Sequence, residues 1–265
     1  MKQTSSNGTV YTLTGKIDAP VIVLIHGLGL TRDTWASHLS DYEKDHQVLN
    51  YDLYGHGESV APPEVPTLTT FAVQLRELMD ELSIQSASLL GFSLGGMINR
   101  RFAMDYPERI TALGILNSPH ERGDEAQKLV EERAAQSDEG GPGATIEATL
   151  IRWFTPNFLE TRKPMLQMIK DWVMANDHAV YAQCRMVLAN GVIELIRPEP
   201  AITTPSFILT CENDSGSTPA MSQGISSEIA GSEVLILPAL QHMGLVERPE
   251  LFTRPFLSFL KSRNL

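Results

Sequence analysis

The chain has 265 residues, which is enough for one substantial core or for one core with an inserted subdomain, and two unrelated domains are less expected. Its 21 Lys and Arg residues against 32 Asp and Glu residues give a formal net charge of −11. Because such a field repels phosphate backbones and anionic membrane surfaces, we expect neither nucleic acid nor a membrane as a partner. Residues 1–8 are polar and no apolar run is long enough to span a bilayer, so we expect a cytoplasmic protein.

The first half of the chain alternates between strand and helix patterns. Short apolar or β-branched runs at residues 9–14, 21–25, 47–53, 87–90 and 111–116 predict strands. Helical spacing is weak over 35–42, clear over 71–82 with Thr69 or Thr70 as the cap, and present again from 94 to about 106. This alternation is typical of an α/β protein with a mostly parallel, doubly wound sheet.

The alternation stops after residue 118. Helical patterns alone follow, at 126–136, 145–154, 165–175 and 180–188, with a glycine-rich break at 138–143. We interpret residues 119–197 as an all-helical cap over the carboxyl edge of the sheet, and residues 1–118 and 198–265 as the core. Aromatic side chains of the cap, such as Trp153 and Tyr181, either line a pocket or simply pack the helices together.

Strand and helix patterns resume after the cap. Residues 205–211 and 233–237 are predicted strands, and residues 219–229 and 250–260 are predicted helices, the last interrupted by Pro255. Cys184 and Cys211 are too few for a disulfide framework and are expected as reduced core thiols. Neither cysteine has a histidine at metal-ligand spacing, so we expect no metal site.

Gly91-Phe92-Ser93-Leu94-Gly95 lies between a predicted strand and a predicted helix. A strand that turns into a helix within one residue strains that residue, and neighbours two positions away crowd it unless they lack side chains. Gly91 and Gly95 satisfy this requirement. The pattern therefore predicts a nucleophile elbow with the Ser93 hydroxyl at a helix N-terminus, the alternative being a glycine-rich turn with an incidental serine.

A serine nucleophile needs a base, and the base needs a carboxylate that fixes its tautomer. His242 follows the predicted strand at 233–237 and is the expected base. Asp214, in the loop after the strand at 205–211, is the expected acid. Glu212 lies closer to the end of that strand, and Asn117 occupies the competing acid position after the strand at 111–116, which strengthens the choice of Asp214.

The remaining histidines are not expected to act as the base. His26 closes a strand before a glycine turn and is expected to be structural, whereas His120 is expected in the wall of the pocket. The others are expected on the surface or in loops: His38, His46, His56 and His178.

Acyl transfer also needs donors for the developing oxyanion, and we expect the backbone N–H groups of Leu28 and Leu94 in this role. Leu94 follows the nucleophile directly, and Leu28 lies in His26-Gly27-Leu28-Gly29 after the strand at 21–25. A dinucleotide fingerprint is the rival interpretation of those glycines. It fails because Arg32 stands where the fingerprint needs its last glycine.

Together with Trp35, residues 52–59 and residues 242–249, these motifs resemble the α/β-hydrolase superfamily over nearly the whole chain outside the cap. Within it, residues 214–242 are most similar to the bacterial 3-oxoadipate enol-lactonase and small carboxylesterase group. The resemblance implies an α/β-hydrolase fold and hydrolysis through an acyl-serine by Ser93, Asp214 and His242, without a cofactor. We expect a small, fairly apolar ester or lactone as the substrate, and a homo-oligomer is compatible with the sequence.

Two other activities remain as alternatives. The meta-cleavage carbon–carbon hydrolases typically carry Asn before the serine and Trp after the histidine, where this chain has Phe92 and Met243. A non-hydrolytic member of the fold would be a ligand receptor or a cofactor-free oxygenase or perhydrolase, although the latter often place Trp where this chain has Leu28. Haloalkane dehalogenases and epoxide hydrolases are excluded because their nucleophile is an aspartate, and here that position is Ser93.

Overall fold

The computed structural model describes residues 1–136 and 140–265 in full, and its centre is an eight-stranded sheet with the order β1-β2-β4-β3-β5-β6-β7-β8. The strands are β1 (Lys2–Thr4), β2 (Val10–Gly15), β3 (Val21–Ile25), β4 (Gln47–Tyr51), β5 (Ala87–Phe92), β6 (Ile110–Leu116), β7 (Ser206–Cys211) and β8 (Glu233–Leu237). All neighbours from β4 to β8 pair in parallel, whereas β2 is antiparallel to both β1 and β4. The predicted mostly parallel α/β sheet is therefore confirmed.

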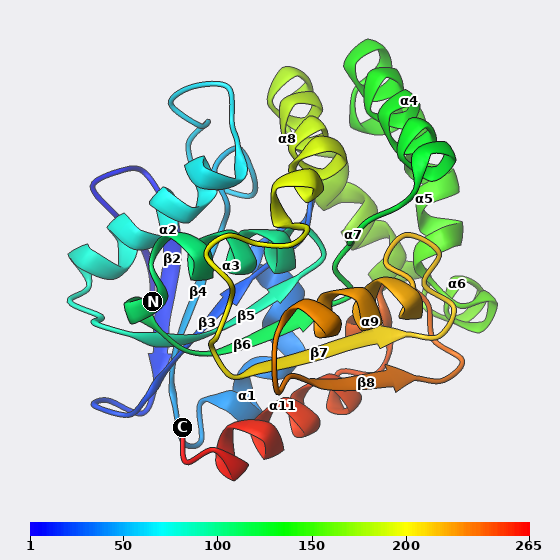
Figure 1. Ribbon diagram of the computed structural model, residues 1–265. Helices are drawn as coiled ribbons and strands as arrows, with labels where there is room; N and C mark the ends of the chain where they lie inside the picture. The colour runs from blue at the N-terminus through cyan, green and yellow to red at the C-terminus, as the bar shows by residue number, and fades with distance from the viewer.

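Helices cover both faces of this sheet (Figure 1). One face carries α2 (Leu68–Glu81), α3 (Leu94–Asp105) and α9 (Pro219–Glu228), and the other carries α1 (Ala36–Tyr42) and α11 (Glu250–Ser262). Every residue of β5 and β7 is buried. This double covering explains why the strands are continuous apolar runs without polar alternation.

A group of helices lies at the end of the sheet toward which β7 and β8 point (Figure 1). It contains α4 (Asp124–Gly140), α5 (Ile146–Trp153), α6 (Pro156–Thr161), α7 (Lys163–Met174) and α8 (His178–Asn190). A break is predicted at 138–143, and its first residues lie outside the described part of the chain. The helix α4 ends at Gly140, and Gly141 then turns the backbone at φ +67°. The sequence patterns missed the short α6, and the division of the chain into core and cap stays a prediction.

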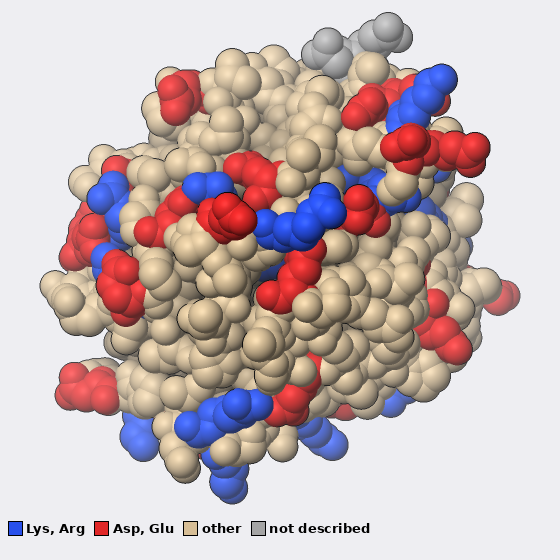
Figure 2. Space-filling model, viewed as in Figure 1, with Lys and Arg blue, Asp and Glu red and all other residues tan. Residues whose placement is uncertain are grey.

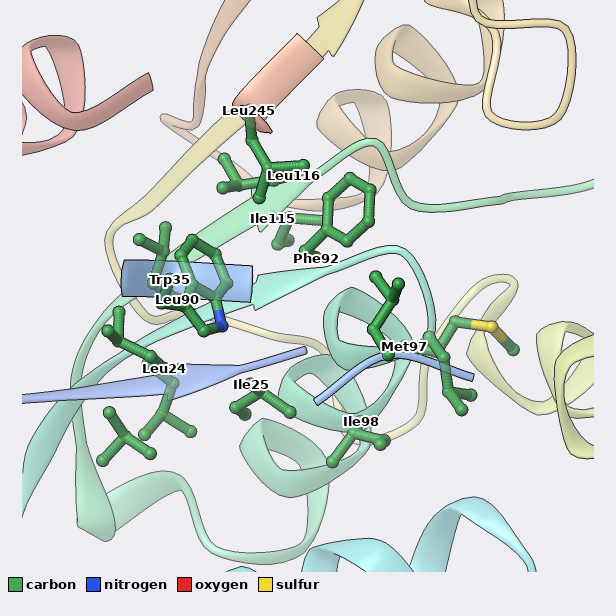
Figure 3. Close-up of a cluster of buried hydrophobic side chains, with 14 of the residues drawn as sticks. Leu24, Ile25, Trp35, Leu90, Phe92, Met97, Ile98, Ile115, Leu116 and Leu245 are labelled. Carbon is green, nitrogen blue, oxygen red and sulfur yellow. The ribbon is translucent and has the colours of Figure 1, made fainter. Parts of the chain in front are cut away.

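The core beneath the predicted elbow joins strands and helices from both faces (Figure 3). Phe92 of β5 lies beside Ile115 of the neighbouring β6, Trp35 and Leu90 lie at the left of the view, and Met97 of α3 lies at the right; all five side chains are fully buried. Full burial of a side chain of this size contributes about 1.5–3 kcal/mol to folding. The turn at Ser93 is thus anchored by packing on both sides.

Two local predictions need correction. The cap of α2 is Thr67 and not Thr69 or Thr70, because the buried Leu68 already belongs to the apolar stripe and the helix begins one turn earlier. Thr67 Oγ1 accepts from the Thr70 amide at 3.2 Å, and Thr70 Oγ1 accepts from the Thr67 amide at 3.0 Å. This reciprocal pair is a capping box.

The prediction that four of the remaining histidines lie at the surface or in loops is wrong for His38, which is buried within α1. His178 is exposed, and His46 and His56 lie in loops as predicted, although both are buried. The two ring nitrogens of His38 contact Thr253 Oγ1 at 2.7 Å and the Leu245 carbonyl oxygen at 3.1 Å. These hydrogen bonds, one to Thr253 of α11 and one to Leu245 shortly before that helix, compensate the burial of the polar ring.

Acidic and basic side chains are interspersed on the face shown in Figure 2, and neither sign gathers into a large patch there. Within the described ranges, no helix combines the length and apolarity needed to cross a bilayer. Cys184 and Cys211 are buried free thiols, which confirms their predicted state. Burial raises the pKa of both thiols to about 12, so both remain protonated near neutral pH.

Candidate active site

Ser93 occupies the one-residue turn between β5 and α3, with a strained backbone at φ +55° and ψ −113°. A Cβ atom on Gly91 would lie 2.1 Å from the Gly95 carbonyl oxygen, and one on Gly95 would lie 2.3 Å from the Ile25 carbonyl oxygen. Both glycines are therefore required by close backbone approach, as the spacing predicts. The strand continues to Phe92, two residues beyond the predicted end, and delivers Ser93 to the carboxyl edge of the sheet.

His242 and Asp214 meet at the same edge, on the loops after β8 and β7. His242 Nδ1 lies 2.7 Å from Asp214 Oδ2. The two loops are tied together because the Asn213 amide donates to the Leu240 carbonyl at 3.0 Å. Since the carboxylate accepts, Nδ1 carries the proton, and Nε2 is left as the basic nitrogen of the ring.

The Asp214 carboxylate is almost fully buried and accepts several hydrogen bonds. Its Oδ1 accepts from the Gly216 and Ser217 amides, both at 2.9 Å, and its Oδ2 accepts from Asn117 Nδ2 at 2.9 Å. Burial alone would raise the pKa of Asp214, but the neighbouring His242 and the donors from Asn117 and Ser217 outweigh it and lower the pKa. The acid is therefore held ionised beside the imidazole.

Asn117 is a site residue that the sequence analysis did not assign a role. It occupies the competing acid position, and its side chain donates to Asp214 in the loop after the neighbouring strand β7. Its backbone lies in the left-handed region at φ +44°, a conformation that asparagine tolerates better than most residues. The position directly after β6, at the carboxyl edge of the sheet, is the feature that identifies it.

Ser93, Asp214 and His242 line one cavity of about 80 Å³. One water molecule needs roughly 10–15 Å³ by the same measure, so the cavity suits a small substrate. Within the described residues no hydrogen bond joins Ser93 Oγ to His242, a contact that is often long before substrate binds. Phe92 and Trp153 flank the imidazole, with ring centroids 4.9 Å and 6.0 Å from it.

The two amides expected to hold an oxyanion lie beside the serine. Leu28 lines the cavity, and Leu94 is the first residue of α3. In the described part of the chain neither N–H group has a backbone or side-chain acceptor. Gly27 lets this loop approach closely, because a Cβ atom there would lie 3.2 Å from the Ser93 Cβ.

Three other candidates lie outside this arrangement. The prediction of His120 as a pocket wall is wrong: its ring packs against Gly224, and its Nε2 lies 3.1 Å from Glu228 Oε2. His26 is structural, as predicted, since its Nδ1 donates to the Gly27 carbonyl and its Nε2 accepts from the Leu53 amide. The exposed Glu212 accepts from the Ala239 amide at 3.0 Å and so stabilises the neighbouring loop.

The cavity wall combines apolar and charged side chains. Leu28, Leu30, Trp153 and Tyr181 supply apolar surface, and the two aromatic residues come from the predicted cap. The wall also contains four arginines, which the sequence analysis did not identify: Arg122, Arg133, Arg152 and Arg185. Arg122 is engaged in structure, because its guanidinium donates to the Leu188 and Ala189 carbonyls and to Gln127.

Fold and sequence together define the class. The chain belongs to the alpha/beta hydrolase family, which matches residues 22–254. It is 27% identical over 255 residues to 3-oxoadipate enol-lactonase 2 of Acinetobacter baylyi, covering 96% of this chain and 93% of that one.

Solved structures agree with this assignment. The enol-lactonase from Burkholderia xenovorans LB400 is similar with a TM-score of 0.89 and 30% identity, covering 96% of this chain and 98% of that one. A hydrolase from Pseudomonas aeruginosa PA01 has a TM-score of 0.88 and 28% identity, covering 98% and 97%. The α/β-hydrolase fold and the predicted resemblance to enol-lactonases are confirmed, and the protein is a hydrolase of this family.

Proposed function

We propose that the protein is a serine hydrolase that cleaves a small carboxylic ester or lactone through an acyl-serine intermediate. The observation that carries the proposal is the 2.7 Å hydrogen bond from His242 Nδ1 to the buried Asp214, in a cavity that Ser93 also lines. The enol-lactonase relatives at 27% and 30% identity support the reaction class. The partner of this site is then a small molecule.

The proposed reaction has two steps, acylation of Ser93 and hydrolysis of the acyl-serine. Ser93 Oγ bonds to the acyl carbon while its proton passes to His242 Nε2, and the acyl carbon–oxygen bond breaks as Nε2 returns the proton to the leaving oxygen. Water then adds to the acyl-serine by the same proton route and releases a carboxylic acid. Asp214 stabilises the imidazolium, and the Leu28 and Leu94 amides donate to the oxyanion.

The test is covalent labelling combined with turnover. A fluorophosphonate should form a bond from Ser93 Oγ to phosphorus with loss of fluoride, seen as one mass shift that peptide mapping assigns to Ser93. The intact enzyme should hydrolyse p-nitrophenyl acetate and butyrate, and Ser93→Ala should lower turnover by at least about a thousandfold.

Ser88→Ala is the matched control. Ser88 is another buried serine and lies on β5, but its hydroxyl contacts Thr111 Oγ1 at 2.8 Å, away from the cavity. This variant should keep both labelling and turnover. If folded enzyme is neither labelled nor active on the esters, or if Ser93→Ala is as active as the parent, the proposed mechanism is wrong.

A further inference from the structure

We propose that Arg133, Arg152 and Arg185 form an anion-binding subsite in the active-site cavity, and that the substrate carries a carboxylate in addition to the acyl group that is cleaved. The inference rests on the proposed serine hydrolase function and narrows its substrate class. It also replaces the expectation of a fairly apolar substrate with that of an anionic ester or lactone.

Arg152 is fixed in position relative to the proposed base. It lies near the end of α5, where the Gln241 side chain donates to the Ile151 and Arg152 carbonyls at 3.1 Å and 3.0 Å. The Met243 amide donates to the Trp153 carbonyl at 2.8 Å. Three hydrogen bonds from the two neighbours of His242 thus join this helix end to the catalytic loop.

The guanidinium of Arg152 lies beside the loop of the proposed acid. A Cβ atom on Gly216 would be 3.3 Å from Arg152 Nη1, and Gly216 is one of the residues that donate to Asp214. Asp214 itself faces His242, so it does not form an ion pair with Arg152. The Arg152 side chain therefore lines the cavity within reach of the reacting groups but outside the triad.

Arg152 has unsatisfied binding capacity. Although half-buried, its guanidinium makes neither a hydrogen bond nor an ion pair to any described residue. Burial lowers the pKa of Arg152, and the positive charges of Arg133 and Arg185 lower it further, while Asp214 and Tyr181 act in the opposite direction. A half-buried cation beside two like charges is stabilised by a bound anion, and a carboxylate matches the planar guanidinium in geometry.

The other two arginines reach the cavity from separate helices. Among the described residues, the acceptors for Arg185 Nη1 on α8 are neutral, namely Tyr181 Oη at 3.2 Å and Thr145 Oγ1 at 3.4 Å. Arg133 lines the same cavity from α4. Among the described lining residues, the one carboxylate is Asp214, which is already engaged with His242. The formal charge of these described lining residues is therefore positive, although the whole chain carries −11.

Two esters with acyl chains of the same length test whether the charge of the substrate, and not its size, determines the preference of the enzyme. The mono-p-nitrophenyl ester of glutaric acid ends in a carboxylate, whereas p-nitrophenyl valerate ends in a methyl group. We expect the enzyme to prefer the glutarate ester in kcat/KM, and Arg152→Gln to lower the ratio of the two kcat/KM values by at least about tenfold. Arg254→Gln removes the same charge from an exposed position on α11 and should leave the ratio unchanged.

Equal kcat/KM for the two esters in the parent enzyme, or an unchanged ratio in Arg152→Gln, would overturn the subsite while leaving the serine mechanism intact. Binding without turnover provides the second measurement. By calorimetry, Ser93→Ala should bind glutarate more tightly than valerate, with a salt-sensitive affinity that the additional change Arg152→Gln weakens by at least about tenfold.

This second experiment keeps the two proposals distinct. If no ester is hydrolysed but Ser93→Ala still binds glutarate through Arg152, the proposed function fails and the anion site stands. If the Ser93→Ala protein binds glutarate no better than valerate, the anion site is refuted whatever the turnover assays give.

Discussion

Asn117→Ala is the sharpest test of how the candidate site is held together. The substitution removes the donor 2.9 Å from Asp214 Oδ2. A hydrogen bond to a charged group contributes about 1.5–3 kcal/mol, and alanine at the left-handed φ of +44° adds roughly 1–2 kcal/mol of strain. We therefore expect the free energy of unfolding to fall by roughly 2.5–5 kcal/mol, the sum of the two effects.

Catalysis should respond separately from stability. Without the Asn117 donor the pKa of Asp214 rises, and the carboxylate is free to turn away from His242. We expect kcat/KM for p-nitrophenyl butyrate to fall by about tenfold to a hundredfold, which corresponds to roughly the free energy of the lost hydrogen bond. The assays are urea unfolding and steady-state hydrolysis at a temperature where the variant is fully folded.

Asn99→Ala is the matched control for this variant. Asn99 is another fully buried asparagine, and its Nδ2 donates to the Gly114 carbonyl at 2.8 Å, away from Asp214. It should lose stability but keep kcat/KM within about threefold. If Asn117→Ala lowers stability and leaves kcat/KM as high as in Asn99→Ala, then Asn117 is a packing residue and the reasoning about Asp214 is wrong.

A further prediction concerns pH. Burial lowers the pKa of His26 and His38 to about 4 and that of His56 to about 3, from 6.5. The unfolded chain then binds more protons below pH 6.5, so stability should fall by up to about 1.4 kcal/mol per pH unit for each histidine. Urea unfolding between pH 7 and 5 tests this, and a stability that stays constant over this range would contradict it.

The strands were the most predictable part of the fold. Residues 21–25 and 233–237 match β3 and β8 at both ends, since a short apolar run bounded by polar or turn residues has few alternative registers. The helices beyond residue 118 were less predictable at their ends. α6 begins at Pro156 and has six residues, which is too short for an apolar stripe to show a period.

The triad candidates were predictable because each follows a strand. In a parallel sheet the carboxyl ends of the strands share one edge, so Ser93, Asp214 and His242 needed only the strand assignments to be placed together. Asn117 satisfies the same rule, but an asparagine cannot serve as the acid, so the sequence pattern does not single it out. The position after β6 supplies a donor to the acid on β7, which only the side-chain geometry reveals.

The arginines show the limit of composition as a guide to substrate. A net charge of −11 describes the field far from the protein, and this is the field that a long polyanion meets. Inside a cavity, charges within a Debye length of about 8–10 Å dominate, and the described residues that line this one carry four guanidinium groups and one carboxylate. Arg133, Arg152 and Arg185 share no sequence period, so only helix packing brings them together. Net charge can therefore argue against nucleic acid and still be compatible with a small anionic substrate.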